Sequence, residues 1–228
     1  MFLRLIFIAL FSSLSLNGFE APVESQHYTS VYQALSPYAV KQETDASCSL
    51  ATAAMLVNAV KALRGDNSPP FSQEEILRRT ASDAWDQAIA QGGPGLTLDQ
   101  FGAILRQVFQ AFELTGTSVH VIHIDNYSDQ EIRNWHRVLE GMATSILPIY
   151  FVVANFDMSK VVPLKGQVGH FSPIGDYDRE RQRVFVLDVD PSIKRSYWVN
   201  ERTFLKSMAT IDTDGKPPKH RGFLIISW

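Results

Sequence analysis

The chain has 228 residues, of which 45% are hydrophobic and 20% are charged, and its formal net charge is -3. This composition is typical of a water-soluble globular protein, and the length accommodates one domain or at most two. Because no excess of basic residues is available to neutralise a phosphate backbone, nucleic acid is excluded as the expected partner.

The first residues differ in composition from the rest of the chain. Arg4 supplies one positive charge, and residues 5–16 are apolar or hydroxylic and are soon followed by Gly18. This pattern is typical of a secretory signal peptide over residues 1–18, and a run of about a dozen residues is too short for a membrane span. A buried first helix is the alternative. We expect residues 19–228 to form one domain that is periplasmic or secreted, without membrane contact after cleavage.

Helical patterns fill the first half of the mature chain. Residues 19–40 show no clear period and are expected to be extended. Apolar residues then recur at the helical spacing and predict an amphipathic helix over 49–64. In three further places a hydroxyl residue is followed three positions later by Glu or Gln, a pair that satisfies free amides of a first helical turn. These helix starts are Ser72…Glu75, Thr97…Gln100 and Ser128…Glu131.

Short β-branched and aromatic runs replace the helical pattern in the second half. The expected strands cover 119–124, 146–154, 168–177, 183–189 and 223–227. Residues 175–180 are expected to connect two of these strands as a solvated hairpin tip that includes Asp176. Helices followed by an antiparallel sheet predict an α+β fold.

Cys48 is the only cysteine of the chain, and it lies where a polar turn gives way to the helix predicted over 49–64. It therefore has no partner for an intrachain disulfide, although an exported protein meets an oxidising compartment. The positive end of a helix stabilises an anion, so a thiol at this position is suited to act as a thiolate nucleophile. The alternative interpretation is that Cys48 serves only as a small buried apolar residue.

Two later residues can complete an acyl-transfer site with the thiol. Gly169 before His170 and Ser172-Pro173 after it interrupt the strand pattern, which indicates a side chain directed into a cleft. The alternative is a structural histidine at the end of a strand, with its hydrogen bonds made inside the protein. Asp188 follows an apolar run and needs a partner if it is buried. Pairing of the two strands that carry these residues would bring Asp188 to His170 and orient the imidazole. Asp190 points to the same face, and spacing alone does not separate the two aspartates.

Gln42 lies six residues before Cys48. Its neutral amide, together with the Cys48 backbone amide, can donate hydrogen bonds to a developing oxyanion, although a surface glutamine is the simpler interpretation of such a residue. No metal site is predicted. His120 and His123 are three positions apart on an expected strand, so they face opposite sides and make a poor ligand pair.

The residues around these positions resemble the motifs of the phytochelatin synthase family. Gln42, Cys48 and the following Leu50-Ala51-Thr52 resemble its catalytic helix. Residues 169–175 resemble its histidine motif, and residues 187–189 resemble its aspartate motif. A fourth stretch, Thr210-Ile211-Asp212, Gly215-Lys216 and Arg221-Gly222-Phe223, also fits. The similarity runs from about residue 27 to the C-terminus.

This resemblance implies a papain-like fold and assigns a role to each of the four candidate catalytic residues. Cys48 falls on the nucleophile, His170 on the acid and base, Asp188 on the residue that orients the histidine, and Gln42 on the oxyanion glutamine.

The resemblance also implies a substrate site. Asp212 and Arg221 fall on positions that hold the amino and carboxylate ends of the γ-glutamyl group of glutathione, and a zwitterionic head needs one charge of each sign. Where the family usually shows basic residues, this chain has Asn155-Phe156-Asp157, a departure that concerns the binding of a second substrate.

The function implied is that of a glutathione γ-glutamylcysteinyltransferase or glutathione hydrolase. Cys48 would release glycine from glutathione, and water or a second glutathione would resolve the acyl-enzyme, as in the short bacterial members that mainly cleave glycine. No cofactor is expected on the protein, and heavy metal ions such as Cd²⁺ would enter as thiolate complexes of glutathione. The alternatives are an exported papain-like peptidase for other peptides and a non-catalytic thiol- or metal-binding module. The oligomeric state is left open, with a homodimer among the alternatives.

Overall fold

The computed structural model describes residues 28–228. The predicted signal peptide and residues 19–27 lie outside this range. The helices are α1 (Ser30–Leu35), α2 (Cys48–Leu63), α3 (Gln73–Thr80), α4 (Asp83–Ile89), α5 (Leu98–Ala111), α6 (Asp129–Thr144) and α7 (Glu201–Met208), with 3-10 turns η1 (Ser36–Tyr38) and η2 (Met158–Lys160). The strands are β1 (Ser118–His123), β2 (Tyr150–Asp157), β3 (Gly169–Asp178), β4 (Arg183–Val186), β5 (Tyr197–Asn200), β6 (Ile211–Asp212), β7 (Lys219–His220) and β8 (Gly222–Ser227).

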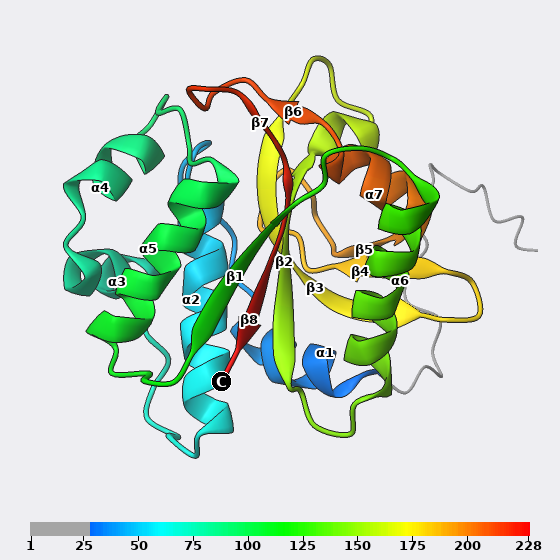
Figure 1. Ribbon diagram of the computed structural model, residues 1–228. Coiled ribbons are helices and arrows are strands. Elements are labelled where there is room, and N and C mark those ends of the chain that lie inside the picture. Colours follow the sequence, from blue (N-terminus) through cyan, green and yellow to red (C-terminus); the bar gives the residue numbers. More distant parts are fainter. Residues whose placement is uncertain (1–27) are drawn as a thin grey trace, which may run out of the picture.

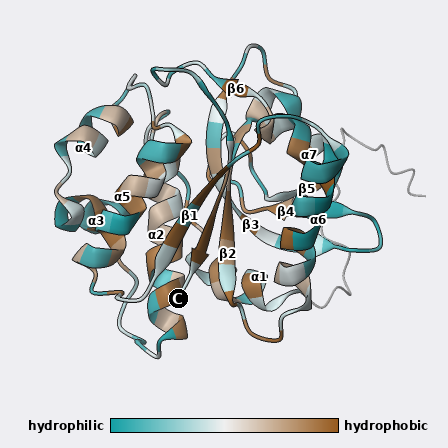
Figure 2. Cartoon of the chain, viewed as in Figure 1, coloured by the Kyte–Doolittle hydropathy of each residue, from teal (hydrophilic) through white to brown (hydrophobic). Residues whose placement is uncertain are grey.

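A twisted antiparallel sheet with the strand order β1-β8-β2-β3-β4-β5 divides the helices into two groups, and β6 and β7 form a separate pair. Figure 1 shows α2 to α5 on one side of the sheet and α6 and α7 on the other. The strands β1, β8 and β2 are strongly apolar in Figure 2, because helices cover them. The expected α+β class, with an antiparallel sheet after the first helices, is confirmed.

Helix α2 confirms the predicted helix over 49–64, beginning one residue earlier, but it is not amphipathic. Every residue from Cys48 to Lys61 is buried, because α1, α3, α5 and β3 pack around it. Its polar residues are therefore satisfied internally: the Lys61 ammonium donates to the carbonyl oxygens of Ser68 and Pro69 at 2.8 Å each. The helix that carries the thiol is thus held rigidly inside the molecule.

The three predicted helix starts are all present. The side chains of Ser72, Thr97 and Ser128 each accept a hydrogen bond from the backbone amide three residues later, at the start of α3, α5 and α6. Only the pair at Thr97 is a complete capping box. These starts were predictable because a capping interaction lies within a single helical turn.

Two of the predicted strands were too long. Strand β2 begins at Tyr150 rather than at 146, and the preceding aliphatic residues are exposed, Ile146 to 94%. Strand β4 ends at Val186, short of the predicted 189. Hydrophobic β-branched residues promote strand formation only where a partner strand pairs with them, and the sequence does not show where the pairing stops.

The predicted hairpin is confirmed, but its tip was placed too early. Strand β3 continues to Asp178, and β4 resumes at Arg183. Asp176 is buried in β3 rather than solvated, and its carboxylate accepts hydrogen bonds from the backbone amides of Tyr177 at 2.7 Å and Thr29 at 3.3 Å. Burial raises the pKa of Asp176 despite these hydrogen bonds.

Several elements were missed. Residues 30–38 of the expected extended segment form α1 and η1, and the short elements α4, β5 and α7 gave no clear periodic signal. Helix α1 packs against β3 through Val31 and Leu35, so tertiary burial stabilises a helix too short to be stable alone. Among residues 28–228, no helix has the length and apolar character needed to cross a bilayer.

Candidate active site

Cys48 is the first residue of α2, with its side chain next to the histidine of β3 and a residual exposure of 9%. The preceding Ser47 does not cap the helix, because its hydroxyl accepts from the amides of Glu43 at 3.2 Å and Thr44 at 2.9 Å. Within residues 28–228 the backbone amide of Cys48 has no acceptor. A nearly enclosed sulfur therefore lies beside a free amide donor at the positive end of a helix.

His170 lies on β3 with 3% of its surface exposed. Its Nε2 is 3.0 Å from Asp188 Oδ1 and 3.0 Å from the Ser172 hydroxyl, and the sulfur of Cys48 is within hydrogen-bonding reach of the ring. Because Nε2 faces Asp188, Nδ1 is the nitrogen left to face the sulfur. The Phe156 ring packs edge-on against the imidazole and restricts its rotation.

The structure resolves the choice between the two aspartates. Asp188 contacts His170, whereas the backbone amide of Asp190 donates to Asp188 Oδ1 at 2.8 Å. The second carboxylate oxygen of Asp188 accepts from the Tyr197 hydroxyl at 2.9 Å. The Leu187 amide donates a hydrogen bond to the Pro173 carbonyl at 3.0 Å, which extends the β3–β4 pairing by one residue. This extension places Asp188 beside the histidine.

The protonation of this group follows from its hydrogen bonds. Burial alone lowers the pKa of His170, but the hydrogen bonds to Asp188 and Cys48 outweigh it and raise the pKa to about 10. Burial raises the pKa of Asp188, but the charged imidazole and the donors around it hold the pKa below its usual value. The imidazole is therefore a cation between a carboxylate and the sulfur at neutral pH, which is the arrangement that a thiol nucleophile needs.

Gln42 is buried at the edge of this group, and its backbone amide donates to the Val189 carbonyl at 2.8 Å. Its side-chain nitrogen donates to the carbonyl oxygens of Thr44 at 2.9 Å and Asp45 at 3.2 Å, while Oε1 has no partner among the described residues. The carboxamide is thus fixed against the turn before α2. Its role as an oxyanion donor stays a prediction.

Asp212 and Arg221 come together as a buried pair, with Arg221 Nη2 3.6 Å from Asp212 Oδ1. The guanidinium also donates to the Ile211 carbonyl at 2.7 Å and to the Thr210 hydroxyl at 3.2 Å, whereas its Nε has no partner within residues 28–228. A Cβ added at Gly169 would lie 3.2 Å from Arg221 Nη2, so the guanidinium lies over the residue next to His170. The two predicted substrate residues therefore lie at the start of β3, the strand that carries His170.

Sequence reasoning missed three residues of this site. Ser172 and Tyr197 contact the His170–Asp188 pair, and Lys41 donates to the carbonyl oxygens of Asp188 at 2.7 Å, Asp190 at 3.1 Å and Ile193 at 2.8 Å. Ser172 stood inside the recognised histidine motif, but Tyr197 and Lys41 had no sequence signal, because they reach Asp188 only through the tertiary fold.

A cavity of about 430 Å³ adjoins Asp212, and the start of α5 together with the segment between β6 and β7 forms its walls. His123 lies in this cavity, and its Nε2 is 3.0 Å from Asp99 Oδ1. No group of three or more histidine, cysteine or acidic residues in the described part of the chain is arranged to hold a metal ion.

A cysteine at the start of a buried helix, a histidine on an antiparallel strand and an aspartate after the next strand define the papain-like class of cysteine proteins. The model of the phytochelatin synthase family matches residues 6–223, and the chain belongs to this family. The predicted family and papain-like fold are confirmed.

Curated relatives carry the name of a transferase. "Glutathione gamma-glutamylcysteinyltransferase" of Schizosaccharomyces pombe is 25% identical over 86% of this chain and 43% of its own length. "Glutathione gamma-glutamylcysteinyltransferase 1" of Arabidopsis thaliana is 41% identical over 59 residues, which are 26% of this chain and 12% of that protein. The chain spans less than half the length of these relatives.

Proposed function

We propose that this protein is a glutathione γ-glutamylcysteinyltransferase that also hydrolyses glutathione. The observation that carries the proposal is the buried Asp212–Arg221 pair beside Gly169, the residue before His170, whose guanidinium keeps one donor unpaired within residues 28–228. A buried charge pair with spare hydrogen-bonding capacity is suited to a zwitterionic α-amino acid head such as that of the γ-glutamyl group. The names of the relatives supply the substrate.

In the first step the Cys48 thiolate attacks the carbonyl carbon of the Cys–Gly bond. The backbone amide of Cys48 donates to the oxyanion, and the side chain of Gln42 joins it when its nitrogen exchanges the carbonyl of Asp45 for the oxyanion. The His170 imidazolium gives its proton to the nitrogen of glycine. The C–N bond breaks, glycine leaves as an amine, and a γ-glutamylcysteinyl thioester remains on Cys48.

In the second step His170, now neutral, takes a proton from water or from the α-amine of a second glutathione as that group attacks the thioester. The C–S bond breaks and the sulfur leaves as the thiolate, which restores the ion pair. Water gives γ-glutamylcysteine, and glutathione gives a phytochelatin of two γ-glutamylcysteine units. Asp188 remains ionised and orients the imidazole throughout.

The test is the release of glycine from glutathione by the purified protein, compared with Cys48→Ala. We expect release by the wild type and none above background by the variant. Equal release would refute the proposal. Cleavage of peptides without a γ-glutamyl head, undiminished in Arg221→Gln, would instead favour a general peptidase.

We propose two further properties of the protein, outside the site itself. The protein holds no metal cofactor, so glycine release continues after treatment with a chelator, and metal ions act as thiolate complexes of the substrate. The chain is exported and cleaved near Gly18, which the intact mass of the protein recovered from a periplasmic extract tests directly.

A further inference from the structure

The cavity that adjoins Asp212 lies on the outer side of the proposed γ-glutamyl site. Asp212 ends β6, and Arg221 directly follows β7, so the two residues stand at the open end of the β6–β7 ribbon. Residues 214–217, at the closed end of this ribbon, extend beyond the pair and line the cavity. Because Asp212 is the predicted partner of the α-amino group, a γ-glutamyl head bound there has the cavity beside its nitrogen.

Interactions between distant parts of the chain hold the walls of this cavity together. Asp99, in the first turn of α5, accepts from Lys219 Nζ at 2.6 Å and lies 3.0 Å from His123 Nε2. The β6–β7 segment rests on the start of α5, since a Cβ added at Gly215 would lie 3.0 Å from Thr97 Cγ2. The cavity therefore has defined walls, and its volume of about 430 Å³ is within the range of small-molecule sites.

Two charged side chains at the cavity remain available to a ligand. The Asp214 carboxylate and the Lys216 ammonium are exposed, and neither forms a hydrogen bond or an ion pair in the described part of the chain. Asp214 adjoins the γ-glutamyl site, because its backbone amide donates to Asp212 Oδ1 at 3.1 Å. One anion and one cation fit the amino and carboxylate groups of another zwitterionic head.

The product of the proposed transfer carries such a second head in the corresponding position. A two-unit phytochelatin ends in the same Cys–Gly bond as glutathione, but the α-amine of the adjoining γ-glutamyl group is acylated by a further γ-glutamylcysteine unit. When the Cys–Gly bond reaches Cys48, this unit extends from the α-nitrogen, beside which the cavity lies. The amide N–H that replaces the ammonium can still donate to the Asp212 carboxylate.

We propose that the cavity is a donor subsite, where Asp214 and Lys216 bind the free γ-glutamyl head of a two-unit phytochelatin, so that the protein removes glycine from its own transfer product. The inference rests on the proposed function and adds a second donor substrate. Cys48 forms a C–S bond to the last cysteinyl carbonyl carbon, the C–N bond breaks, and His170 protonates the departing glycine. Water then gives a proton to His170 and forms the C–O bond, and the C–S bond breaks. Desglycyl phytochelatin leaves, and the thiolate is restored.

Phytochelatin offers two scissile bonds, and only one of them needs the cavity. Attack at the last Cys–Gly bond releases glycine and leaves desglycyl phytochelatin. Attack at the internal bond, with the free head at Asp212 and Arg221, releases glutathione and yields γ-glutamylcysteine while the cavity stays unused. Initial rates of both products from purified two-unit phytochelatin, quantified by mass spectrometry, separate these binding modes in one assay.

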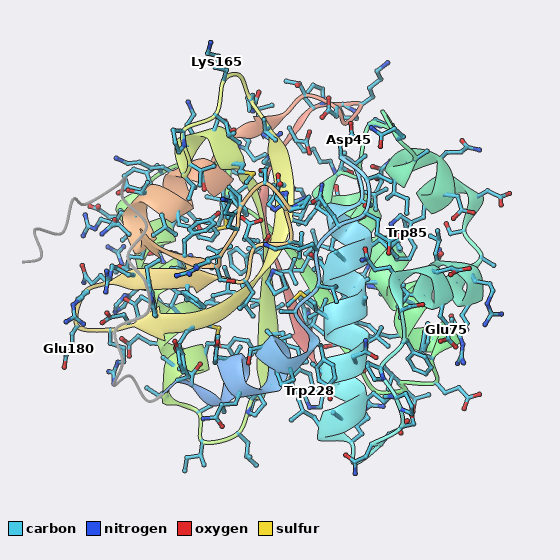
Figure 3. All side chains as sticks on the ribbon, turned by 180° about the vertical axis from the view of Figure 1, so that it is seen from behind. Asp45, Glu75, Trp85, Lys165, Glu180 and Trp228 are labelled. Carbon is cyan, nitrogen blue, oxygen red and sulfur yellow. The ribbon has the colours of Figure 1, made fainter. Side chains whose placement is uncertain are left out.

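The variant Asp214→Asn/Lys216→Gln removes one charge of each sign from the cavity and leaves the net charge unchanged. A matched control is Arg137→Gln/Glu180→Gln, since both side chains are exposed and form no hydrogen bond or ion pair within residues 28–228. Figure 3 shows Glu180 on the opposite side of the molecule from Asp45, which precedes α2. Arg137 lies on α6, across the sheet from α5.

We expect the wild type to form desglycyl phytochelatin and the cavity variant to form it at least about fivefold more slowly, the effect of two exposed ion pairs. Glycine release from glutathione by this variant, and all activities of the control, should stay within about twofold of the wild type.

Three results would overturn the donor subsite and leave the proposed function standing. They are a wild type that cleaves glutathione but forms no desglycyl phytochelatin, a cavity variant that forms it at an unchanged rate, and a cavity variant that loses the same factor on both substrates. A wild type that releases no glycine from glutathione overturns the proposed function itself.

Discussion

The ion pairs His170–Asp188 and Arg221–Asp212 are both buried, and they differ in how completely their hydrogen bonds are satisfied. Asp188 accepts from the His170 ring, the Asp190 amide and the Tyr197 hydroxyl, all at 3.0 Å or less. Asp212 and Arg221 are 3.6 Å apart, and one guanidinium nitrogen has no partner among residues 28–228. The hydrogen bonds of the His170–Asp188 pair are all made within the protein, whereas the Asp212–Arg221 pair has a donor that a ligand can use.

Under the proposed function, this contrast separates two tasks, the orientation of the imidazole and the binding of the substrate. A catalytic imidazole needs a fixed orientation before the substrate arrives, because reorganisation during the reaction raises the barrier. A substrate site needs charged groups that form their best hydrogen bonds only with the ligand, since a buried donor without a partner destabilises the free protein. Changes to the two pairs should therefore affect different measurements.

The largest effect is expected from Asp188→Asn, which removes the carboxylate that raises the pKa of His170. Below a pH of about 10 the imidazolium is present, and it is lost as the pH rises through that value. In the variant the pKa of His170 falls, so the alkaline limb of the pH profile of glycine release moves to lower pH. The rate at neutral pH should fall roughly a thousandfold.

A second measurement checks this prediction without a substrate. Because Cys48 is the only cysteine, alkylation by iodoacetamide reports this thiol alone. The variant should react more slowly than the wild type at neutral pH, because a charged imidazole no longer lies beside the sulfur. An unchanged pH profile for both reactions would show that Asp188 does not set the protonation of His170.

The next largest effect is expected from Asp212→Asn and Arg221→Gln, which change the incompletely satisfied pair. Each should lower kcat/KM for glutathione roughly a hundredfold, because a charged ligand group loses its partner. Alkylation of Cys48 should remain within about twofold of the wild type, since the thiol and the imidazole are untouched. Thermal unfolding of each variant serves as the control. A parallel loss of alkylation would place these residues in the catalytic group instead.

Tyr197→Phe removes one donor to Asp188 and keeps the packing of β5. Burial and the nearby carboxylate raise the pKa of Tyr197, so the hydroxyl remains a neutral donor. Loss of a hydrogen bond to a buried charge should lower kcat about tenfold, with KM little changed. A rise in KM as large as the fall in kcat would contradict a role that acts through Asp188 alone.

The smallest effect is expected from Lys41→Met, which removes the donor to three carbonyl oxygens of residues 188–193. Burial lowers the pKa of Lys41, although Asp188 and Asp190 favour its charged form. A looser loop should lower kcat about fivefold and lower the midpoint of thermal unfolding. Lys41→Arg should restore most of the activity; failure of that rescue, with full stability, would show that the loop does not depend on this cation.

Local sequence signals identified the parts of the site that depend on neighbours in the chain. The start of α2 near Cys48 was predicted from the spacing of apolar residues, and the cap at Thr97 from an interaction within a single helical turn. The hairpin of β3 and β4 follows from two apolar runs joined by a turn, and it carried the expectation that Asp188 meets His170. Such interactions leave a pattern in a short stretch of sequence.

The remainder depended on contacts between distant residues. Lys41 is 147 positions from Asp188, so no local pattern connects them. The all-round burial of α2 arises from packing by α1, α3, α5 and β3 together, and α1 is itself too short for its sequence to predict a helix. Asp212 and Arg221 were identified from the family resemblance, and their pairing with each other was seen only in the structure.

The sequence by itself determined the class of fold, the helix that presents the thiol and the candidate catalytic residues Cys48, His170 and Asp188, because each is encoded in periodicity or in a motif. The tertiary structure alone decided which aspartate pairs with His170, which donors complete that carboxylate and which charges remain available. Hydrogen bonds and burial depend on distances of a few ångströms, and only the packed arrangement of helices and sheet fixes those distances for residues far apart in the chain.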